Sequence, residues 1–327
     1  MSGFVYDIYH ENPHDICTLN NCLYLGWGDV SQIGGALRTF APERYTTLNN
    51  CYHLNKCSDT PQGTQVTEKQ LKSGEITKLL QAGRTDACHW AQTLGEMPNL
   101  YHAPDKGKTN YVYYDKANNR WACEDFRLTD GTPLPIGLDF TATKATYDRT
   151  LAAGKATLCL PYELPVQGFR AYTLADRQES RTAVHFKEVN GTLGAYRPYL
   201  LVADGTLQLG GENLQVKADR SSIVLSAGNY YFKGAVHDVV NWWLTSDHAY
   251  ILQADGLFHK VTSDNPSVTV PAYRAYISYN SHEGAKPLSI VFDGETTGIY
   301  GTTDDTTDGK NGPVYDLQGR RVADRLD

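Results

Sequence analysis

The stretch Thr18-Leu19-Asn20-Asn21-Cys22-Leu23-Tyr24-Leu25 recurs as Thr47-Leu48-Asn49-Asn50-Cys51-Tyr52-His53-Leu54. The copies lie 29 residues apart and share five consecutive identical residues. A period of this length suits one coil of a parallel β-solenoid, in which short strands stack on copies of themselves at a spacing of about 4.8 Å. We therefore predict that residues 1–62 form the end of a right-handed parallel β-solenoid.

The repeat also predicts which side chains stack. Leu19 is expected on Leu48 and Cys22 on Cys51, as ladders inside the coil. Asparagine tolerates left-handed backbone and bonds its own chain, so the Asn20/Asn49 position is expected at a corner. Two coils cannot bury a continuous core alone. We therefore expect further coils before Met1 and a cap from the region that follows.

Residues 63–135 are predicted to form a helical cap and a β-hairpin connector. Thr67 and Gln70 fit a capping box, which marks a helix start. An apolar stripe interrupted by a glycine follows, which predicts two short helical turns or one weak helix between about 67 and 82. Residues 111–123 read as strand, turn and strand.

The region 136–300 is a succession of short strand candidates rich in Val, Tyr, Leu and Thr and divided by turn residues. Many short strands at such spacing favour a β-sandwich, which we predict to be antiparallel. The strands are expected at 156–160, 169–174, 183–189, 198–203, 214–217, 222–225, 230–236, 249–253, 257–261, 267–270, 273–279 and 288–292. The polar stretch 301–312 is predicted to be a linker, and 313–327 begins as strand, turn and strand.

Composition limits the function classes. The chain has 327 residues, a prior for two or three domains, and carries a net charge of −7 without a Lys/Arg cluster, which argues against nucleic-acid binding. No stretch approaches the roughly 18 apolar residues of a membrane span. Residues 1–4 have no basic start or apolar run, so a signal peptide is not expected within this chain.

The seven cysteines do not predict a metal or redox site. Their number is odd, and the spacings of Cys17 to Cys22 and of Cys51 to Cys57 are not the C-x2-C of zinc or redox motifs. Buried, unpaired cysteines are the expectation. We predict no cofactor and no metal.

Several segments together carry a family resemblance. They are 49–54, 66–67 with 70–75, 89–95, 139–142 with 147–149, 157–162, 271–276 and 314–322. The first three resemble the end of a GLUG-type repeat region and the segment that follows it. The next three resemble the opening and closing strands of an associated β-sandwich. The last resembles the first half of a C-terminal sorting-type tail. The chain resembles surface and secreted proteins of Bacteroidetes-type bacteria.

This resemblance implies an extracellular or outer cell-surface location. It also implies that the chain is a fragment, because the second half of the sorting-type tail is missing. The family motifs carry no catalytic or binding residues that can be transferred to this sequence.

A binding site is predicted where Trp242 and Trp243 stand between His237 and Asp247. Adjacent tryptophans can stack on a sugar ring, and a histidine beside a carboxylate, as in His237-Asp238 and Asp247-His248, can act as a general base. Neighbours on a strand point to opposite faces, so one tryptophan is expected in the core. A glycan platform and an ordinary aromatic core both remain open for this segment.

Three functions are compatible with the sequence. The leading hypothesis is a non-enzymatic surface protein, an adhesin that binds a host or dietary glycan or an extracellular protein. The alternative is a polysaccharide-acting enzyme on the β-solenoid, whose acids would come from Asp7, Glu11, Asp15, Asp29 and Glu43. A purely structural spacer is the third. No catalytic residue is predicted, since no motif for nucleophilic or metal-assisted catalysis occurs.

Overall fold

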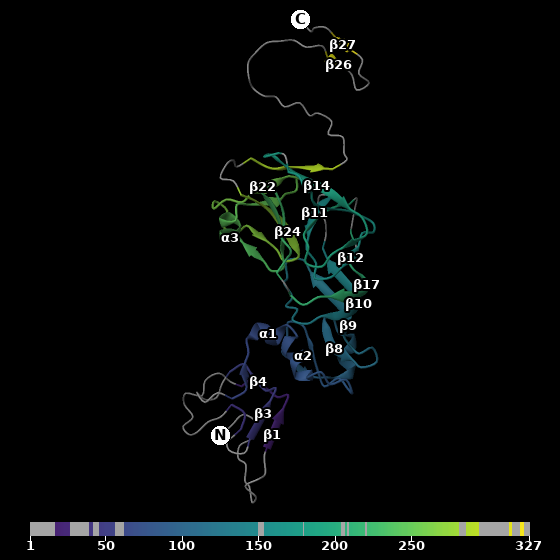
Figure 1. The fold of residues 1–327 in the computed structure, drawn as a ribbon, viewed down its shortest axis with the longest axis vertical. Coiled ribbons are helices and arrows are strands. Elements are labelled where there is room, and N and C mark those ends of the chain that lie inside the picture. Colours follow the sequence, from purple (N-terminus) through teal and green to yellow (C-terminus); the bar gives the residue numbers. More distant parts are fainter. Residues whose placement is uncertain are drawn as a thin grey trace, which may run out of the picture. The chain divides into compact units, whose positions relative to one another are not determined.

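The computed structural model describes residues 17–26, 39–41, 46–55, 62–149, 154–178, 180–203, 207, 209–219, 221–280 and 286–293, and the backbone of 314–315 and 321–323. Met1–Asp293 form one compact unit and Gly294–Asp327 a second. Strands make up 45% of the structure and helices 10%, which confirms the predicted mainly-β class (Figure 1).

The two copies of the N-terminal repeat pair in parallel, at the predicted offset. Strand β1 (Cys17–Asn20) lies beside β3 (Thr46–Asn49), with Leu19 opposite Leu48. Strands β2 (Leu23–Tyr24), β4 (Tyr52–His53) and β5 (Thr64–Gln65) form a second parallel stack.

Asparagine side chains join the two copies at their corner. Asn49 Nδ2 donates to Asn20 Oδ1 at 2.9 Å, and Asn50 Nδ2 donates to Asn21 Oδ1 at 2.7 Å. Asn21 and Asn50 have φ of 54° and 53°, in the left-handed region that asparagine tolerates better than most residues. The asparagine ladder was predicted, but the left-handed position lies one residue further along.

Two short helices follow, where the sequence predicts them. Helix α1 (Glu68–Lys72) begins with the Thr67/Gln70 capping box, and α2 (Glu75–Gln81) begins at Gly74, whose φ of 88° breaks the helical run. Both helices bury apolar side chains against the second stack. That cluster consists of Val66, Leu71, Ile76 and Leu80, with Leu23, Tyr52 and Leu54 packed on it.

A six-stranded sheet adjoins the helices. Its order is β17-β10-β9-β8-β6-β7, with the 3₁₀ helix η1 (Ala103–Gly107) beside it. Its strands are β6 (Trp90–Thr93), β7 (Asn99–Leu100), β8 (Tyr111–Asp115), β9 (Arg120–Thr129), β10 (Phe140–Asp148) and β17 (Gly211–Val216). The pairing of β8 with β9 is the predicted hairpin. The sheet continues across residue 135, since β9 pairs with β10.

Two five-stranded sheets make up most of the remaining unit. The first has the order β11-β16-β13-β14-β25 and the second β18-β19-β24-β21-β22. The first contains β11 (Lys155–Leu158), β13 (Arg170–Leu174), β14 (Ala183–Val189), β16 (Tyr199–Val202) and β25 (Ser289–Phe292). The second contains β18 (Leu225–Ala227), β19 (Tyr230–Ala235), β21 (Ala249–Leu252), β22 (Phe258–Lys260) and β24 (Arg274–Tyr279). Short pairs join β12 (Leu164–Pro165) to β15 (Thr192–Leu193) and β20 (Val239–Val240) to β23 (Thr269–Val270).

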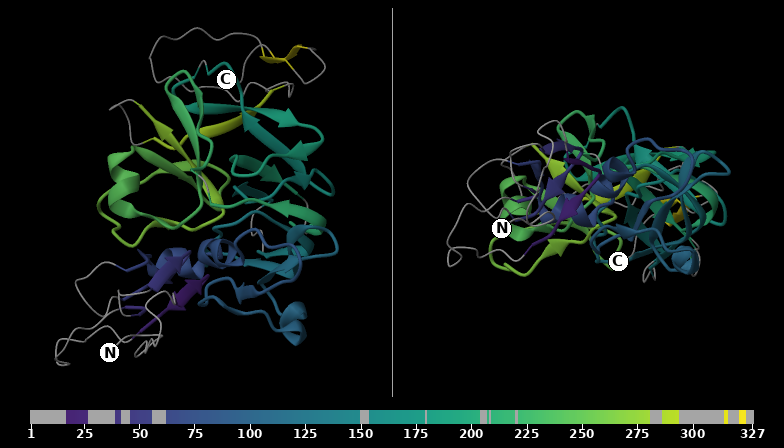
Figure 2. Two further views of the ribbon diagram at one scale, coloured as in Figure 1. Left: turned by 60° about the horizontal axis from the view of Figure 1, so that its bottom comes forward. Right: turned by 90° about the horizontal axis from the view of Figure 1, so that it is seen from below.

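These two sheets share one hydrophobic core and lie side by side in Figure 2. Phe186 of the first sheet meets Phe232 of the second edge to face, with ring centroids 5.5 Å apart. The region predicted as an antiparallel sandwich is not purely antiparallel, because β14 pairs with β25 in parallel and β10 pairs with β9 in parallel. The physical reason is connection length: β25 returns from nearly a hundred residues downstream of β14, so no tight hairpin dictates its direction.

Each strand predicted between residues 156 and 292 has a counterpart whose first residue is shifted by at most three positions. The C-terminal strands β26 (Val314–Tyr315) and β27 (Arg321–Ala323) pair antiparallel, also as expected. The predicted linker 301–312 and the candidate acids Asp7, Glu11, Asp15, Asp29 and Glu43 lie outside the described residues. Within the described part of the chain, no helix combines the length and apolar character needed to cross a membrane.

Candidate functional site

The Trp-Trp pair lies on a helix, not on a strand. Helix α3 (Asn241–Ser246) follows β20 directly and buries Asn241 and Leu244. Residues three apart share one face of a helix, so Trp242 and Trp243 both point away from that buried face. The prediction that one tryptophan enters the core is therefore wrong, because the segment has a helical period and not a period of two.

Local contacts explain why so short a helix forms here. The buried Asn241 Nδ2 donates to the carbonyl oxygens of Thr262 and Asn265, at 3.0 and 2.9 Å. Leu244 is fully buried in a cluster with side chains of the second sheet. His248, with φ of 51°, ends the helix in a left-handed conformation. Tertiary packing, and not intrinsic propensity, holds the helix.

The two indoles form an exposed aromatic corner. Trp242 and Trp243 are 68% and 53% exposed, more than is usual for side chains of this size. Their ring centroids lie 5.5 Å apart with planes at 85°. Two apolar ring surfaces are therefore left in contact with solvent at one place on the molecule.

Polar groups lie directly beside this corner. Lys233 Nζ donates to both oxygens of Asp247, at 2.6 and 2.8 Å. The Tyr276 hydroxyl hydrogen-bonds Asp247 and the Trp243 side chain, and burial followed by the nearby Asp247 charge raises the pKa of Tyr276. Lys233 also lies 5.6 Å from the centroid of the Tyr231 ring. We call Trp242, Trp243, Tyr231, Lys233 and Asp247 the α3 platform.

The structure brings three of the four predicted site residues together and separates the fourth. Trp242, Trp243 and Asp247 belong to α3 and its end, whereas His237 Nε2 lies 4.0 Å from Asp219. The neighbouring Asp238 accepts a hydrogen bond from the backbone of Ala272 at 2.9 Å. Asp238 and Asp247 therefore contact Ala272 and Lys233, and the carboxylate nearest to His237 in these contacts is that of Asp219. Lys233 and Tyr231 were not predicted from the sequence. They lie two residues apart on β19, so they share one face of that strand.

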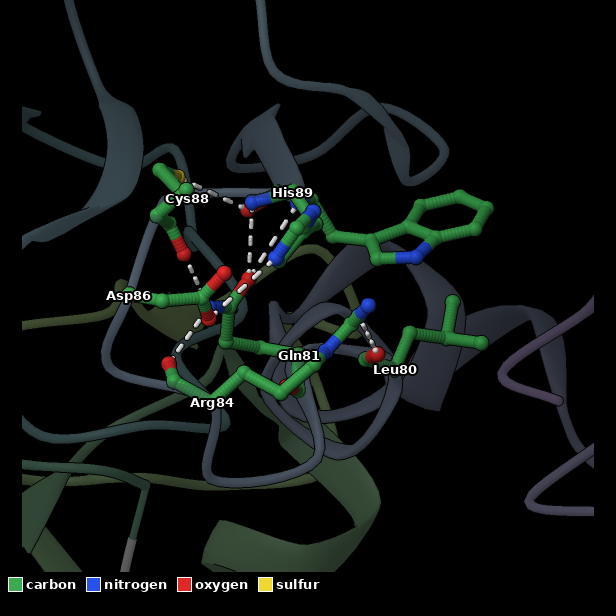
Figure 3. A network of polar contacts seen from close by, with 8 residues as sticks. Leu80, Gln81, Arg84, Asp86, Cys88 and His89 are labelled. Carbon is green, nitrogen blue, oxygen red and sulfur yellow. Dashed lines mark hydrogen bonds and ion pairs between the residues drawn. The ribbon is translucent and has the colours of Figure 1, made fainter.

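A second set of reactive residue types occurs near α2. Asp86, Cys88 and His89 follow one another closely, and His89 Nε2 lies 3.6 Å from Asp86 (Figure 3). Burial raises the pKa of the Cys88 thiol, so the thiol form is favoured over the nucleophilic thiolate. The Cys88 sulfur accepts from the backbone N–H of Tyr114 at 3.2 Å.

Gln81 organises the same corner as a structural joint. Its Nε2 donates to the carbonyl oxygens of Arg84 and Ala87, both at 2.7 Å, and its Oε1 accepts from the His89 N–H at 2.9 Å (Figure 3). Arg84 donates back to the carbonyl oxygen of Leu80 at 2.8 Å. These contacts satisfy backbone groups at and just after the C-terminal end of α2, where carbonyl oxygens lack partners within the helix.

The prediction of buried cysteines holds for three of the six described cysteines, while Cys17, Cys22 and Cys88 are only partly buried. Cys51, Cys123 and Cys159 are buried and all six described cysteines are unpaired. Burial raises the pKa of Cys123 and of Cys159 to about 12. Among the described residues, no group of three or more His, Cys, Asp or Glu side chains is placed to hold a metal ion.

No family model, no curated protein and no solved structure matches this chain.

Proposed function

We propose that this chain is part of a non-enzymatic cell-surface or secreted protein and that the α3 platform binds a glycan. The observation that carries the proposal is the exposed, perpendicular pair of indoles at 5.5 Å. The aliphatic C–H faces of a sugar ring are apolar, and they can lie against an indole that water otherwise covers at a free-energy cost.

The polar part of the platform suits the rest of a sugar. A pyranose presents hydroxyl groups around its edge, which both donate and accept hydrogen bonds. Lys233 supplies donors and Asp247 supplies acceptors beside Trp243. A few placed polar groups around an aromatic surface are what orients a ligand in most small-molecule sites.

The same proposal assigns roles to the other regions. The parallel stacks of β1 to β5 are the end of a β-solenoid shaft, and α1 and α2 cap it, since their buried face packs on the second stack. The two facing sheets are a β-sandwich that presents α3. The resemblance to Bacteroidetes-type surface proteins supports an outer-surface or extracellular location for this arrangement.

The test is a screen of the purified chain on an array of host and plant glycans, with matrix proteins alongside. We expect binding to a glycan class that Trp242→Ala and Trp243→Ala each weaken at least tenfold. Leu100→Ala removes an equally exposed apolar side chain elsewhere, 64% exposed, and should leave binding unchanged.

The other outcomes separate the competing functions. Binding to a matrix protein alone would replace the glycan proposal by protein adhesion. Release of reducing sugar by the purified chain would favour the enzyme. Absence of all binding by protein shown to be folded by circular dichroism would favour the structural spacer.

A further inference from the structure

A pocket of about 370 Å³ lies between the ends of β11, β21 and β24. Its lining comes from Arg149 and residues 155–157, from 251–254, and from 269–271 with 274–275. Three cationic side chains line it, those of Arg149, Lys155 and Arg274. No residue of the α3 platform contributes to this lining.

The charge of Arg274 is already balanced. Its Nε donates to Asp130 Oδ1 at 3.1 Å, and its Nη2 donates to Asp130 Oδ2. The Tyr147 hydroxyl donates to the same Asp130 Oδ1 at 2.9 Å. Both oxygens of Asp130 are thus engaged, and this carboxylate neutralises one cation.

Among the described residues, the other two cations form no direct ion pair of this kind. Arg149 is half-buried, and its Nη1 donates to the neutral carbonyl oxygen of Thr157 at 2.6 Å. In the described part of the chain, no carboxylate forms an ion pair with Arg149 or Lys155. Gly256 lies next to the Lys155 side chain. The acid that precedes this glycine is Asp255, and its carboxylate contacts His259 Nε2 at 2.7 Å.

The pocket is therefore locally positive in a chain whose net charge is −7. Burial, and then repulsion from Arg274, lower the pKa of Arg149 in spite of the nearby Tyr147 and Asp130. Of the residues that the structure describes, Asp130 is thus the one nearby carboxylate for both Arg149 and Arg274, which leaves positive charge in excess, and a bound anion would compensate that excess. A guanidinium and an ammonium group also supply the donors that an oxyanion needs.

We propose that this pocket binds an oxyanion group, a carboxylate, sulfate or phosphate, between Arg149 and Lys155. Such a group can come from a free inorganic anion or from an acidic residue of a polysaccharide, and both present the same oxygen atoms to the pocket. The proposal stands independently of sugar binding at α3, because it rests on different residues.

The test is isothermal titration calorimetry of the full chain with sodium sulfate, sodium phosphate, sodium glucuronate and a sulfated polysaccharide, each against sodium chloride of equal ionic strength. We expect at least one to bind. Arg149→Gln and Lys155→Gln should each weaken that binding about tenfold, the effect of losing one charged hydrogen bond. Lys155 is half-buried and forms no ion pair with a described residue, so Lys155→Gln remains informative if Arg149→Gln folds poorly.

Two controls set the specificity of the result. Lys144→Gln removes an exposed cation of β10 that does not line the pocket, and Trp242→Ala alters only the α3 platform; neither should change anion binding. Binding of the inorganic anions alone identifies a free anion as the source, and polysaccharide binding that sulfate displaces identifies an acidic polymer. Absence of all binding, or an equal loss in Lys144→Gln or Trp242→Ala, would overturn the proposal.

Discussion

Asp130 is a carboxylate beside the pocket that accepts hydrogen bonds from the side chains of Arg274 and Tyr147. Burial by itself raises the pKa of Asp130, but hydrogen bonds from Arg274 and Tyr147 outweigh burial and hold that pKa below its usual value. A carboxyl whose pKa is lowered by folding stabilises the fold above its unfolded pKa of about 4. That stabilisation is lost as the pH falls through the folded pKa.

We expect Asp130→Asn to lower the free energy of unfolding at pH 7 by about 1–3 kcal/mol, because Arg274 loses its charged partner. The variant should also lose less stability than the unaltered protein when the pH falls below about 4. Guanidinium unfolding at neutral and acidic pH measures both. Asp176→Asn, whose 86% exposed side chain pairs with Lys187, is the control and should change stability by less than about 0.5 kcal/mol. Equal losses in the two variants would contradict the assignment.

Asn50 has a left-handed backbone conformation, and its side chain also forms hydrogen bonds. Its Nδ2 bonds Asn21 Oδ1 and the carbonyl oxygen of Leu79, at 2.7 and 2.6 Å. Asn50→Gly and Asn50→Ala both remove the side-chain hydrogen bonds, but alanine keeps a Cβ at φ of 53° whereas glycine has none. We expect Asn50→Ala to be less stable than Asn50→Gly by about 1 kcal/mol, measured by chemical unfolding. Equal stability would argue against the left-handed corner.

Helix α3 stands where the sequence suggests a strand, and the burial of two of its side chains distinguishes the two conformations. Leu244 is fully buried and Trp242 is 68% exposed, although they are two residues apart. Leu244→Ala should lower the free energy of unfolding by roughly 2–4 kcal/mol. Trp242→Ala should change it by less than about 0.5 kcal/mol. Thermal or chemical unfolding of both variants is the measurement, and a large loss in Trp242→Ala would mean that this indole is packed.

Elements that rest on local signals were predictable from the sequence. The 29-residue offset predicted the pairing of Leu19 with Leu48, and the capping box predicted the start of α1. Short runs rich in Val, Tyr, Leu and Thr between turn residues predicted the strands after 156. Helix α3 was not predictable in this way. Its six residues are too few for intrinsic helical stability, and adjacent valines and tryptophans favour strands. The packing of Leu244 and the bonds of Asn241 decide its conformation.

The candidate sites depend still more on tertiary structure. Two tryptophans adjacent in sequence drew attention to the α3 platform, but Lys233 reaches it from β19 through its bond to Asp247. The cationic pocket draws Arg149 and Arg274 from segments more than a hundred residues apart. No local pattern predicts such a meeting, since it follows from how the two sheets face each other.

At the scale of the whole molecule, the two five-stranded sheets should unfold as one unit, because they share a core. Phe186 and Phe232 meet across it with centroids 5.5 Å apart. We expect Phe186→Leu and Phe232→Leu each to destabilise the protein by about 1–2 kcal/mol. The double variant should depart from additivity by about 0.5–1.5 kcal/mol, which a double-mutant cycle measures. Strict additivity would mean that the sheets are independent.

The indole N–H signals of the tryptophans report whether the α3 platform binds a sugar. The chain has five tryptophans, and Trp242→Ala and Trp243→Ala assign the two platform signals by their disappearance. Protein with ¹⁵N-labelled tryptophan is titrated with a panel of host and plant oligosaccharides. We predict that one class shifts the signals of Trp242 and Trp243 and leaves the other three in place. A panel that shifts neither signal, or a ligand that shifts only the signal of Trp90 or Trp121, would contradict sugar binding by the α3 platform.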